Sequence, residues 1–215
     1  MKAPIGLAIH TSSPDLGLAL GSSDIIRHEV WDLGRDMTTY LHEKLAEFIA
    51  PQSFQELNLA FIAVAKGPGS FTGTRMGMTV ARTLSQQLSI PLFGISSLGA
   101  IAAHHRKQQT FGSLPTSIVV QMEAQRKELH VGIYEDSSEW DTQSDRVLSS
   151  EIWQGKWNHI QADRSVHSVV SVDAPVHQGE FATAILDIAH RAYDRGDRPQ
   201  WWAATPTYGQ HPVIP

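Results

Sequence analysis

A glycine-rich turn at residues 67–75 holds the residue types that could bind a phosphate. It follows a short apolar run, residues 59–65, which predicts a strand buried on both faces. It precedes a helix predicted over residues 72–88, which Ser70 or Thr72 can cap. A turn from a strand into a helix N-terminus can bind an anion through backbone N–H groups and the helix dipole. The order of these elements therefore makes anion binding one possible role.

Two known phosphate-binding patterns do not fit this turn. A Walker A loop needs a lysine after its last glycine, where Thr74 stands. A dinucleotide fingerprint needs glycines spaced one residue more narrowly than Gly67, Gly69 and Gly73. Glycine also lets the backbone turn sharply and lets a neighbour approach closely. We therefore interpret Gly67, Gly69, Ser70 and Gly73 as a structural glycine turn.

The helix after the turn has a stripe of small residues. Gly73, Gly77, Ala81 and Ser85 recur every four residues, which places them on one face of the helix. Each glycine inside a helix costs about 1 kcal/mol relative to alanine, so close packing must offset that cost. The stripe can pack against the chain's own sheet or against a partner, and the spacing alone leaves both open.

Charge is distributed unevenly along the chain. Residues 57–122 contain no Asp or Glu and five basic residues, whereas the whole chain has a formal net charge of −5. These basic residues can pair with carboxylates elsewhere in the chain, or their face can meet an acidic or phosphate-bearing partner. Because it has no carboxylate, this segment cannot provide a metal-ligand set or a general base.

The composition is that of an ordinary globular protein. The chain has 215 residues, of which 41% are hydrophobic and 18% charged. No apolar run approaches the ~20 residues that span a membrane, and the start lacks the apolar region of a signal peptide. The chain has no cysteine, which fits a cytoplasmic location. Its acidic balance disfavours strong binding of nucleic acid by this chain alone.

Hydrophobic periodicity predicts an α/β fold in two lobes, residues 1–105 and 106–215. The N-terminal lobe begins with three strands joined by tight turns, followed by a helix over residues 37–49. The C-terminal lobe repeats strands and a helix more loosely. The polar segment 136–163 has no assigned structure, and the tail with Trp201 and Trp202 is expected to be extended.

A complete catalytic apparatus is absent from the sequence. None of the eleven histidines forms a pair at the i, i+4 spacing of a helical metal site. No Gly-x-Ser-x-Gly elbow occurs, because Ser70 lies between Gly69 and Phe71. We therefore predict no catalytic, cofactor-binding or metal-binding residues in this chain.

Several segments together resemble the TsaB (YeaZ) family. They are Ile9-His10-Thr11-Ser12, the run from Gly67 to Gly77, Ile95-Ser96-Ser97-Leu98, Glu123 to His130, and Pro206-Thr207-Tyr208. The resemblance runs along nearly the whole chain. It implies an actin-like/Hsp70-like ATPase (ASKHA) fold in two lobes. It also implies a non-catalytic subunit that acts with a TsaD-like catalytic subunit and a TsaE-like ATPase to attach threonylcarbamoyl to the adenosine beside the anticodon of tRNAs.

The chain departs from this family's pattern at His10. Members of the family that the chain resembles usually carry Asp-Thr-Ser there. In active members of the superfamily, that Asp helps to hold metal-bound phosphates. The His-x-x-x-His pair that holds the metal of TsaD is also absent. The resemblance thus implies that ATP and a metal ion belong to the partner subunits and that tRNA is met only through the complex. The alternative is an active actin-fold kinase, ATPase or peptidase.

The resemblance also implies that the two N-lobe helices, residues 37–49 and 72–88, form the interface with TsaD or with a second copy when the chain is free. On that basis a bulky residue at Gly77 should weaken the heterodimer at least tenfold, unless the stripe packs on the chain's own sheet. The expected interface residues are Tyr40, Leu41, Leu45, Gly73, Met76, Gly77, Val80, Ala81 and Leu84.

Overall fold

The chain forms two compact units in a computed structural model that describes residues 3–23, 26–108, 116–135, 145–162 and 168–207. The first unit contains Met1–Ser97 and Val176–Thr207, and the second contains Leu98–Pro175 and Tyr208–Pro215. The sequence predicted one boundary near residue 105. In the structure the chain instead returns to the first unit, because helix α5 (Ala182–Asp194) packs against the sheet of that unit.

A five-stranded mixed sheet forms the centre of the first unit, in the order β3-β2-β1-β4-β5. The first three strands form the predicted antiparallel meander, and β4 and β5 continue the sheet parallel to β1. Strand β4 is buried along its whole length, as its continuous apolar run predicts. The strands are β1 (Gly6–His10), β2 (Asp15–Gly21), β3 (Ile26–Asp32), β4 (Phe61–Ala65) and β5 (Leu92–Ile95).

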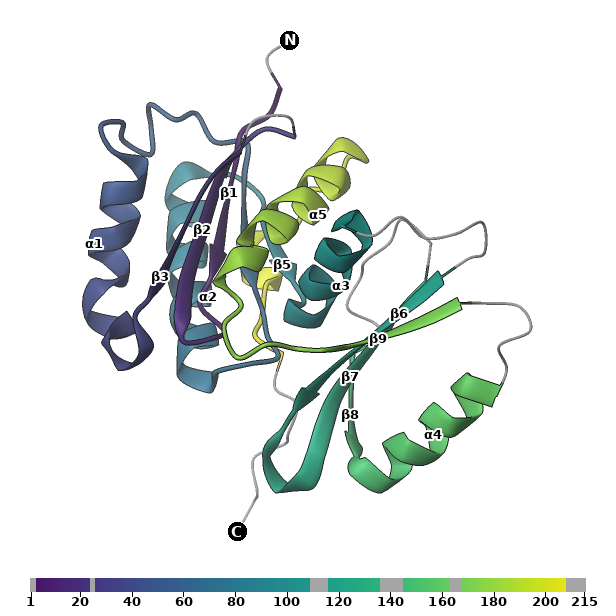
Figure 1. Ribbon diagram of the computed structural model, residues 1–215. Coiled ribbons are helices and arrows are strands. Elements are labelled where there is room, and N and C mark those ends of the chain that lie inside the picture. The colour runs from purple at the N-terminus through teal and green to yellow at the C-terminus, as the bar shows by residue number, and fades with distance from the viewer. Residues whose placement is uncertain (1–2, 24–25, 109–115, 136–144, 163–167, 208–215) are drawn as a thin grey trace. The chain divides into compact units, whose positions relative to one another are not determined.

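Helices cover both faces of this sheet (Figure 1). Helices α1 (Met37–Ile49) and α2 (Phe71–Leu88) share one apolar core with β1 and β2, and α5 packs against β1, β2 and β4. Ser70 caps α2, since its Oγ accepts a hydrogen bond from the Gly73 N–H at 3.2 Å. Short 3-10 helices occur at η1 (Gly34–Asp36), η4 (Gly179–Phe181) and η5 (Trp201–Ala203).

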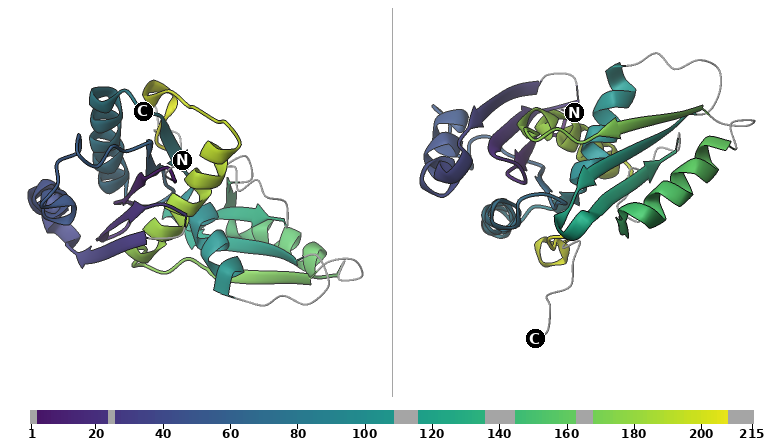
Figure 2. Two further views of the ribbon diagram at one scale, coloured as in Figure 1. Left: turned by 90° about the horizontal axis from the view of Figure 1, so that it is seen from above. Right: turned by 60° about the horizontal axis from the view of Figure 1, so that its bottom comes forward.

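The second unit is built on a four-stranded sheet in the order β8-β7-β6-β9. Helix α4 runs along one face of this sheet (Figure 2), where Trp153 is buried beside Val119 and Val131. Its elements are α3 (Ser97–Gln108), β6 (Thr116–Glu123), η2 (Gln125–Lys127), β7 (Glu128–Tyr134), β8 (Arg146–Ser149), α4 (Ser150–Ala162) and β9 (Ser168–Asp173). Strand β8 and helix α4 lie in the segment to which the sequence assigned no structure.

The predicted α/β class is confirmed, with one sheet in each unit. The tail is less extended than expected, because Trp201–Ala203 forms a 3-10 turn and Ala204 joins the core of the first unit. Among the described residues, no helix combines the length and the apolar character needed to cross a membrane.

Candidate partner-binding groove

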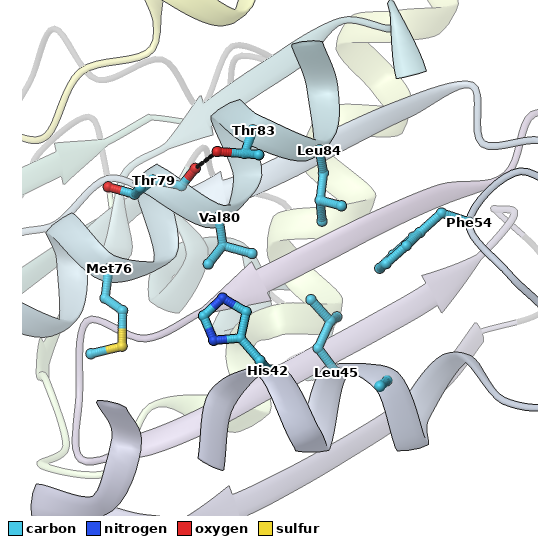
Figure 3. Close-up of a pocket in the computed structure, with 9 residues that line it drawn as sticks. His42, Leu45, Phe54, Met76, Thr79, Val80, Thr83 and Leu84 are labelled. Carbon is cyan, nitrogen blue, oxygen red and sulfur yellow. Dashed lines mark hydrogen bonds between the residues drawn. The ribbon is translucent and has the colours of Figure 1, made fainter. Parts of the chain in front are cut away.

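An apolar groove lies between helices α1 and α2 (Figure 3). It has a volume of about 440 Å³. Met76 faces His42 across it, while Val80 and Leu45 point into it from the two helices. None of its described lining residues is Asp, Glu, Lys or Arg. The lining consists of His42, Leu45, Ala46, Phe54, Met76, Thr79, Val80, Thr83 and Leu84.

The groove forms because both helices direct an apolar row toward the same side of the sheet. In α1, Leu41, Leu45 and Phe48 recur at helical spacing and are buried in the core. In α2, Met76 and Leu84 pack only partly against that core. Apolar surface that is left partly open between two helices is typical of a protein or ligand interface.

Four of the nine predicted interface residues line this groove. Leu45, Met76, Val80 and Leu84 line the groove itself. Tyr40 lies on α1 and is 40% exposed. The groove therefore includes four of the residues that the family resemblance placed at the interface, and Tyr40 is exposed on one of its two helices.

The small-residue stripe of α2 packs against the chain's own first strand. A Cβ added at Gly73 would lie 2.0 Å from the Thr11 carbonyl oxygen, and one at Gly77 would lie 2.1 Å from the Thr11 Oγ1. Ala81 and Leu41 are also buried within the first unit. The structure thus corrects the prediction for these four positions. Gly73 and Gly77 pack against Thr11, directly after β1, because only the absence of bulk lets α2 approach this closely, whereas Ala81 and Leu41 pack in the core.

The glycine turn packs against the end of β1 in the same way. The Ser70 N–H donates to the Ser12 carbonyl at 2.7 Å, and the Gly73 N–H donates to the Ser70 Oγ. Gly69 could not hold a side chain, since its Cβ would lie 2.1 Å from the Ser12 carbonyl oxygen. Gly67 and Gly69 have φ values of 93° and 153°, which glycine adopts most easily. The N–H groups of Ser70 and Gly73 therefore already donate hydrogen bonds within the chain.

His10 occupies the last position of β1 and is completely buried. The described residues offer neither of its ring nitrogens a hydrogen-bond partner. Burial lowers the pKa of His10 to about 4, because it disfavours the charged imidazolium, whereas the charge of the Asp15 carboxylate acts in the opposite direction. The imidazole is therefore neutral at pH 7.

We expect His10 to make the first unit sensitive to acid. Its pKa is about 6.5 in the unfolded chain and about 4 in the folded one, so its stabilising contribution is complete above pH 6.5 and is lost as the pH falls toward 4. Between pH 7 and pH 5 the free energy of unfolding should fall by about 2 kcal/mol on this account. Urea unfolding at a series of pH values, with chelator present, measures the change.

The substitution His10→Asn should remove this part of the pH dependence. The matched control is His159→Asn on the exposed surface of α4, which should leave the dependence unchanged. Identical pH profiles for the wild type and the His10→Asn variant would contradict the assignment.

Five residues that line the groove were not among the predicted interface residues: His42, Ala46, Phe54, Thr79 and Thr83. Thr79 and Thr83 follow Met76 at helical spacing. They could have been predicted if polar residues on the same face of the helix had been included with the apolar ones. His42 is separated from Leu45 by three positions on α1 and could have been found in the same way. Phe54 lies in the loop after α1, where no periodicity indicates the direction of a side chain.

The comparisons with known proteins agree with this architecture. The model of the family described as TsaD, tRNA N6-adenosine threonylcarbamoyltransferase, matches residues 39–150. The chain is 36% identical over 137 residues to the tRNA threonylcarbamoyladenosine biosynthesis protein TsaB of Bacillus subtilis, which covers 60% of this chain and 54% of that one. It is 26% identical over 96 residues to TsaB of Escherichia coli, covering 45% and 42%. The chain thus spans about half the length of these curated relatives.

Two solved structures share the fold over nearly the whole chain. One is a protein from Pseudomonas aeruginosa with similarity to peptidase YeaZ, with a TM-score of 0.69, 20% identity and coverage of 96% of this chain and 100% of that one. The other is YeaZ from Pseudomonas aeruginosa, with a TM-score of 0.66, 22% identity and coverage of 95% and 99%. The two-sheet arrangement is accordingly the actin-like ATPase fold that the resemblance implied. Because the family model spans more than half of the chain, and these relatives and structures are TsaB and YeaZ proteins or similar to them, the chain belongs to the TsaB (YeaZ) family.

Proposed function

We propose that this chain is a non-catalytic subunit of the machinery that makes threonylcarbamoyladenosine in tRNA. It binds a TsaD-like catalytic subunit through the groove between α1 and α2, and acts with a TsaE-like ATPase. The observation that supports this most strongly is the open apolar groove on the part of the chain that matches the family model.

The chemistry of the groove fits a protein partner. Its lining is mostly apolar and contains no Asp, Glu, Lys or Arg, and α1, which forms one wall, also carries the ion pair of Lys44 with Glu47 at 2.7 Å. An apolar centre with a polar rim is the usual composition of a specific protein interface.

The family match suggests why one groove can serve two partners. The chain resembles the model of the catalytic subunit over a region that contains almost all of α1 and the whole of α2. Two related chains can pair through equivalent surfaces about an approximate two-fold axis, as identical chains do about an exact one. The groove can therefore hold a second copy when the chain is free, and a TsaD-like subunit when one is present.

The site at the end of β1 supports a non-catalytic role. The N–H groups of Ser70 and Gly73 donate within the chain, so they do not face a phosphate. At position 10 a buried neutral imidazole stands where a carboxylate would be needed to hold a metal-bound phosphate. ATP and its metal ion are accordingly assigned to the partner subunits, and tRNA is bound only by the complex.

Size-exclusion chromatography with light scattering tests the proposal directly. The purified chain alone should elute at twice the protomer mass. After addition of the TsaD-like subunit from the same organism, it should elute as a complex that contains one copy of each chain. A monomer that does not co-elute with the TsaD-like subunit would refute the proposed partnership.

An ATPase assay separates this proposal from that of an independent enzyme. The chain alone should release no phosphate above the rate of a boiled sample. Steady hydrolysis by the isolated chain that is lost in a Ser12→Ala variant would favour the actin-fold kinase or ATPase alternative.

A further inference from the structure

Three side chains with metal-binding chemistry meet at one end of the first sheet. They are Asp15 at the start of β2, Asp32 at the end of β3, and His177 in the segment before η4. Each can offer one ligand atom, and the three atoms lie within 4.8 Å of one another. Asp15 is buried, whereas Asp32 and His177 are exposed.

The strand register brings the two carboxylates together. Asp15 and Asp32 are direct partners in the antiparallel pair of β2 and β3. Side chains of partner residues project from the same face of a sheet, and like charges placed there are destabilising. A cation between these carboxylates would remove that repulsion.

Backbone contacts hold His177 in place beside them. The Gln178 N–H donates to the Ser13 Oγ at 3.2 Å, and the Gly179 N–H donates to the Asp15 Oδ2 at 3.3 Å. A Cβ at Gly17 would lie 2.0 Å from the Gly179 carbonyl oxygen, so the two backbones approach as closely as glycine permits. The segment that carries the histidine is therefore held firmly against β2.

Two of the three side chains, those of His177 and Asp15, are in direct contact. The His177 Nδ1 is hydrogen-bonded to the Asp15 Oδ1. The second oxygen of Asp15 is oriented by the Gly179 N–H. Ligand carboxylates are commonly oriented in this way by a neighbouring donor, which strengthens metal binding.

His10 is an independent observation at this end of the sheet, because it is a buried polar side chain without a hydrogen-bond partner among the described residues. It pairs with Gly17, and Gly17 lies two residues after Asp15 on β2, so His10 projects from the same face as Asp15 and Asp32. Its imidazole is fully buried, has no hydrogen-bond partner among the described residues, and feels the charge of Asp15. A buried imidazole without a partner is rare and asks for an explanation.

We propose that Asp15, Asp32 and His177 bind one divalent transition-metal ion. One imidazole nitrogen and two carboxylate oxygens suit Zn²⁺ or Mn²⁺. Ligand bonds of about 2.0–2.2 Å require ligand atoms about 3.3 Å apart, so the hydrogen-bonded pair must open slightly to admit the ion. The ion joins the β2–β3 hairpin to the segment that leads into η4 and α5.

The metal site is separate from the groove, and it follows neither from the family resemblance nor from the proposed function. The sequence predicted no metal site, because no set of ligands occurs in it at the short spacing of a helical metal site. Here His177 and Asp15 are 162 residues apart in the chain. Binding the ion would stabilise the folded first unit, since the three ligands come together only when the chain is folded.

Metal binding to the full-length chain tests the proposal. After treatment with chelator and exhaustive dialysis, the chain is incubated with Zn²⁺ or Mn²⁺, dialysed again and analysed for metal by mass spectrometry. One ion per chain and a raised melting temperature are expected. Co²⁺ should give visible absorption bands, which report the ligand geometry directly.

Two variants and two matched controls locate the site. His177→Ala and Asp32→Asn change exposed ligands and should weaken binding at least about tenfold. His159→Ala and Asp197→Asn change exposed residues elsewhere and should bind as the wild type does. Circular dichroism before addition of metal verifies that each variant is folded. The proposal is overturned if the wild type retains no ion, or if both ligand variants bind as well as the wild type.

Discussion

The variant Gly77→Leu should lose about 3 kcal/mol of folding stability. A Cβ at this position would lie 2.1 Å from the Thr11 Oγ1, so leucine forces α2 away from β1. Overpacking of this kind costs about 1–3 kcal/mol. The shift also breaks the buried hydrogen bond from the Thr11 Oγ1 to the Gly73 carbonyl, 2.7 Å long, which contributes about 1 kcal/mol. The melting temperature should fall by about 6–12 °C, as measured by circular dichroism.

Gly155→Leu is the matched control for this change. Gly155 also lies inside a helix, α4, but no atom lies within 4 Å of the Cβ that would be added there. The same substitution should therefore be neutral or should stabilise the helix by up to about 1 kcal/mol. If Gly77→Leu melts like the wild type but no longer binds the TsaD-like subunit, the stripe is an interface after all and the packing described here is wrong.

The variant Met76→Glu should weaken the complex with the TsaD-like subunit at least about a hundredfold, which corresponds to about 2.7 kcal/mol. Met76 lies on the α2 wall of the groove, opposite His42. When a partner fills the groove, a carboxylate there is desolvated without a paired cation, and such burial is strongly unfavourable. Fold stability should change little, because Met76 is only half-buried in the free chain. Titration calorimetry measures the affinity.

Two further variants make the result specific to the groove. Gln86→Glu introduces the same charge on an exposed part of α2 outside the groove lining and should leave the affinity unchanged. Met76→Leu keeps the volume and apolar character and should retain binding. Equal affinity of the Met76→Glu and wild-type chains would exclude the groove as the binding surface.

Local patterns predicted most of the first unit. The buried run before the turn became β4, and α2 begins at Phe71 and ends at Leu88, within one residue of the expected bounds. The N-terminal cap of α2 by Ser70 could also be predicted, because a serine directly before a helix commonly accepts a hydrogen bond from a backbone N–H of the first turn. In the second unit, the segment containing β8 and α4 was left unassigned, because its Trp and charged residues show no single period.

The direction of the small-residue stripe could not be read from the sequence. Gly73 and Gly77 permit close approach to any backbone, and the identity of that backbone depends on the order of strands in the sheet. Thr11 became the neighbour because β1 pairs with β4, the strand that precedes the turn. For the groove, periodicity could find the α2 residues, but the position of Phe54 depends on the path of a loop.

The return of the chain to the first unit has a consequence for the order of synthesis. Residues 98–175 of the second unit are continuous, whereas the first unit is interrupted by them. Helix α5 covers β1, β2 and β4, and its residues Ile185, Leu186 and Ala189 are completely buried. During translation, that face of the first sheet stays uncovered until α5 has left the ribosome. Because synthesis adds about 5–20 residues per second, this face of the first sheet stays exposed for some seconds. The second sheet is made later, but it can be completed as soon as β9 emerges.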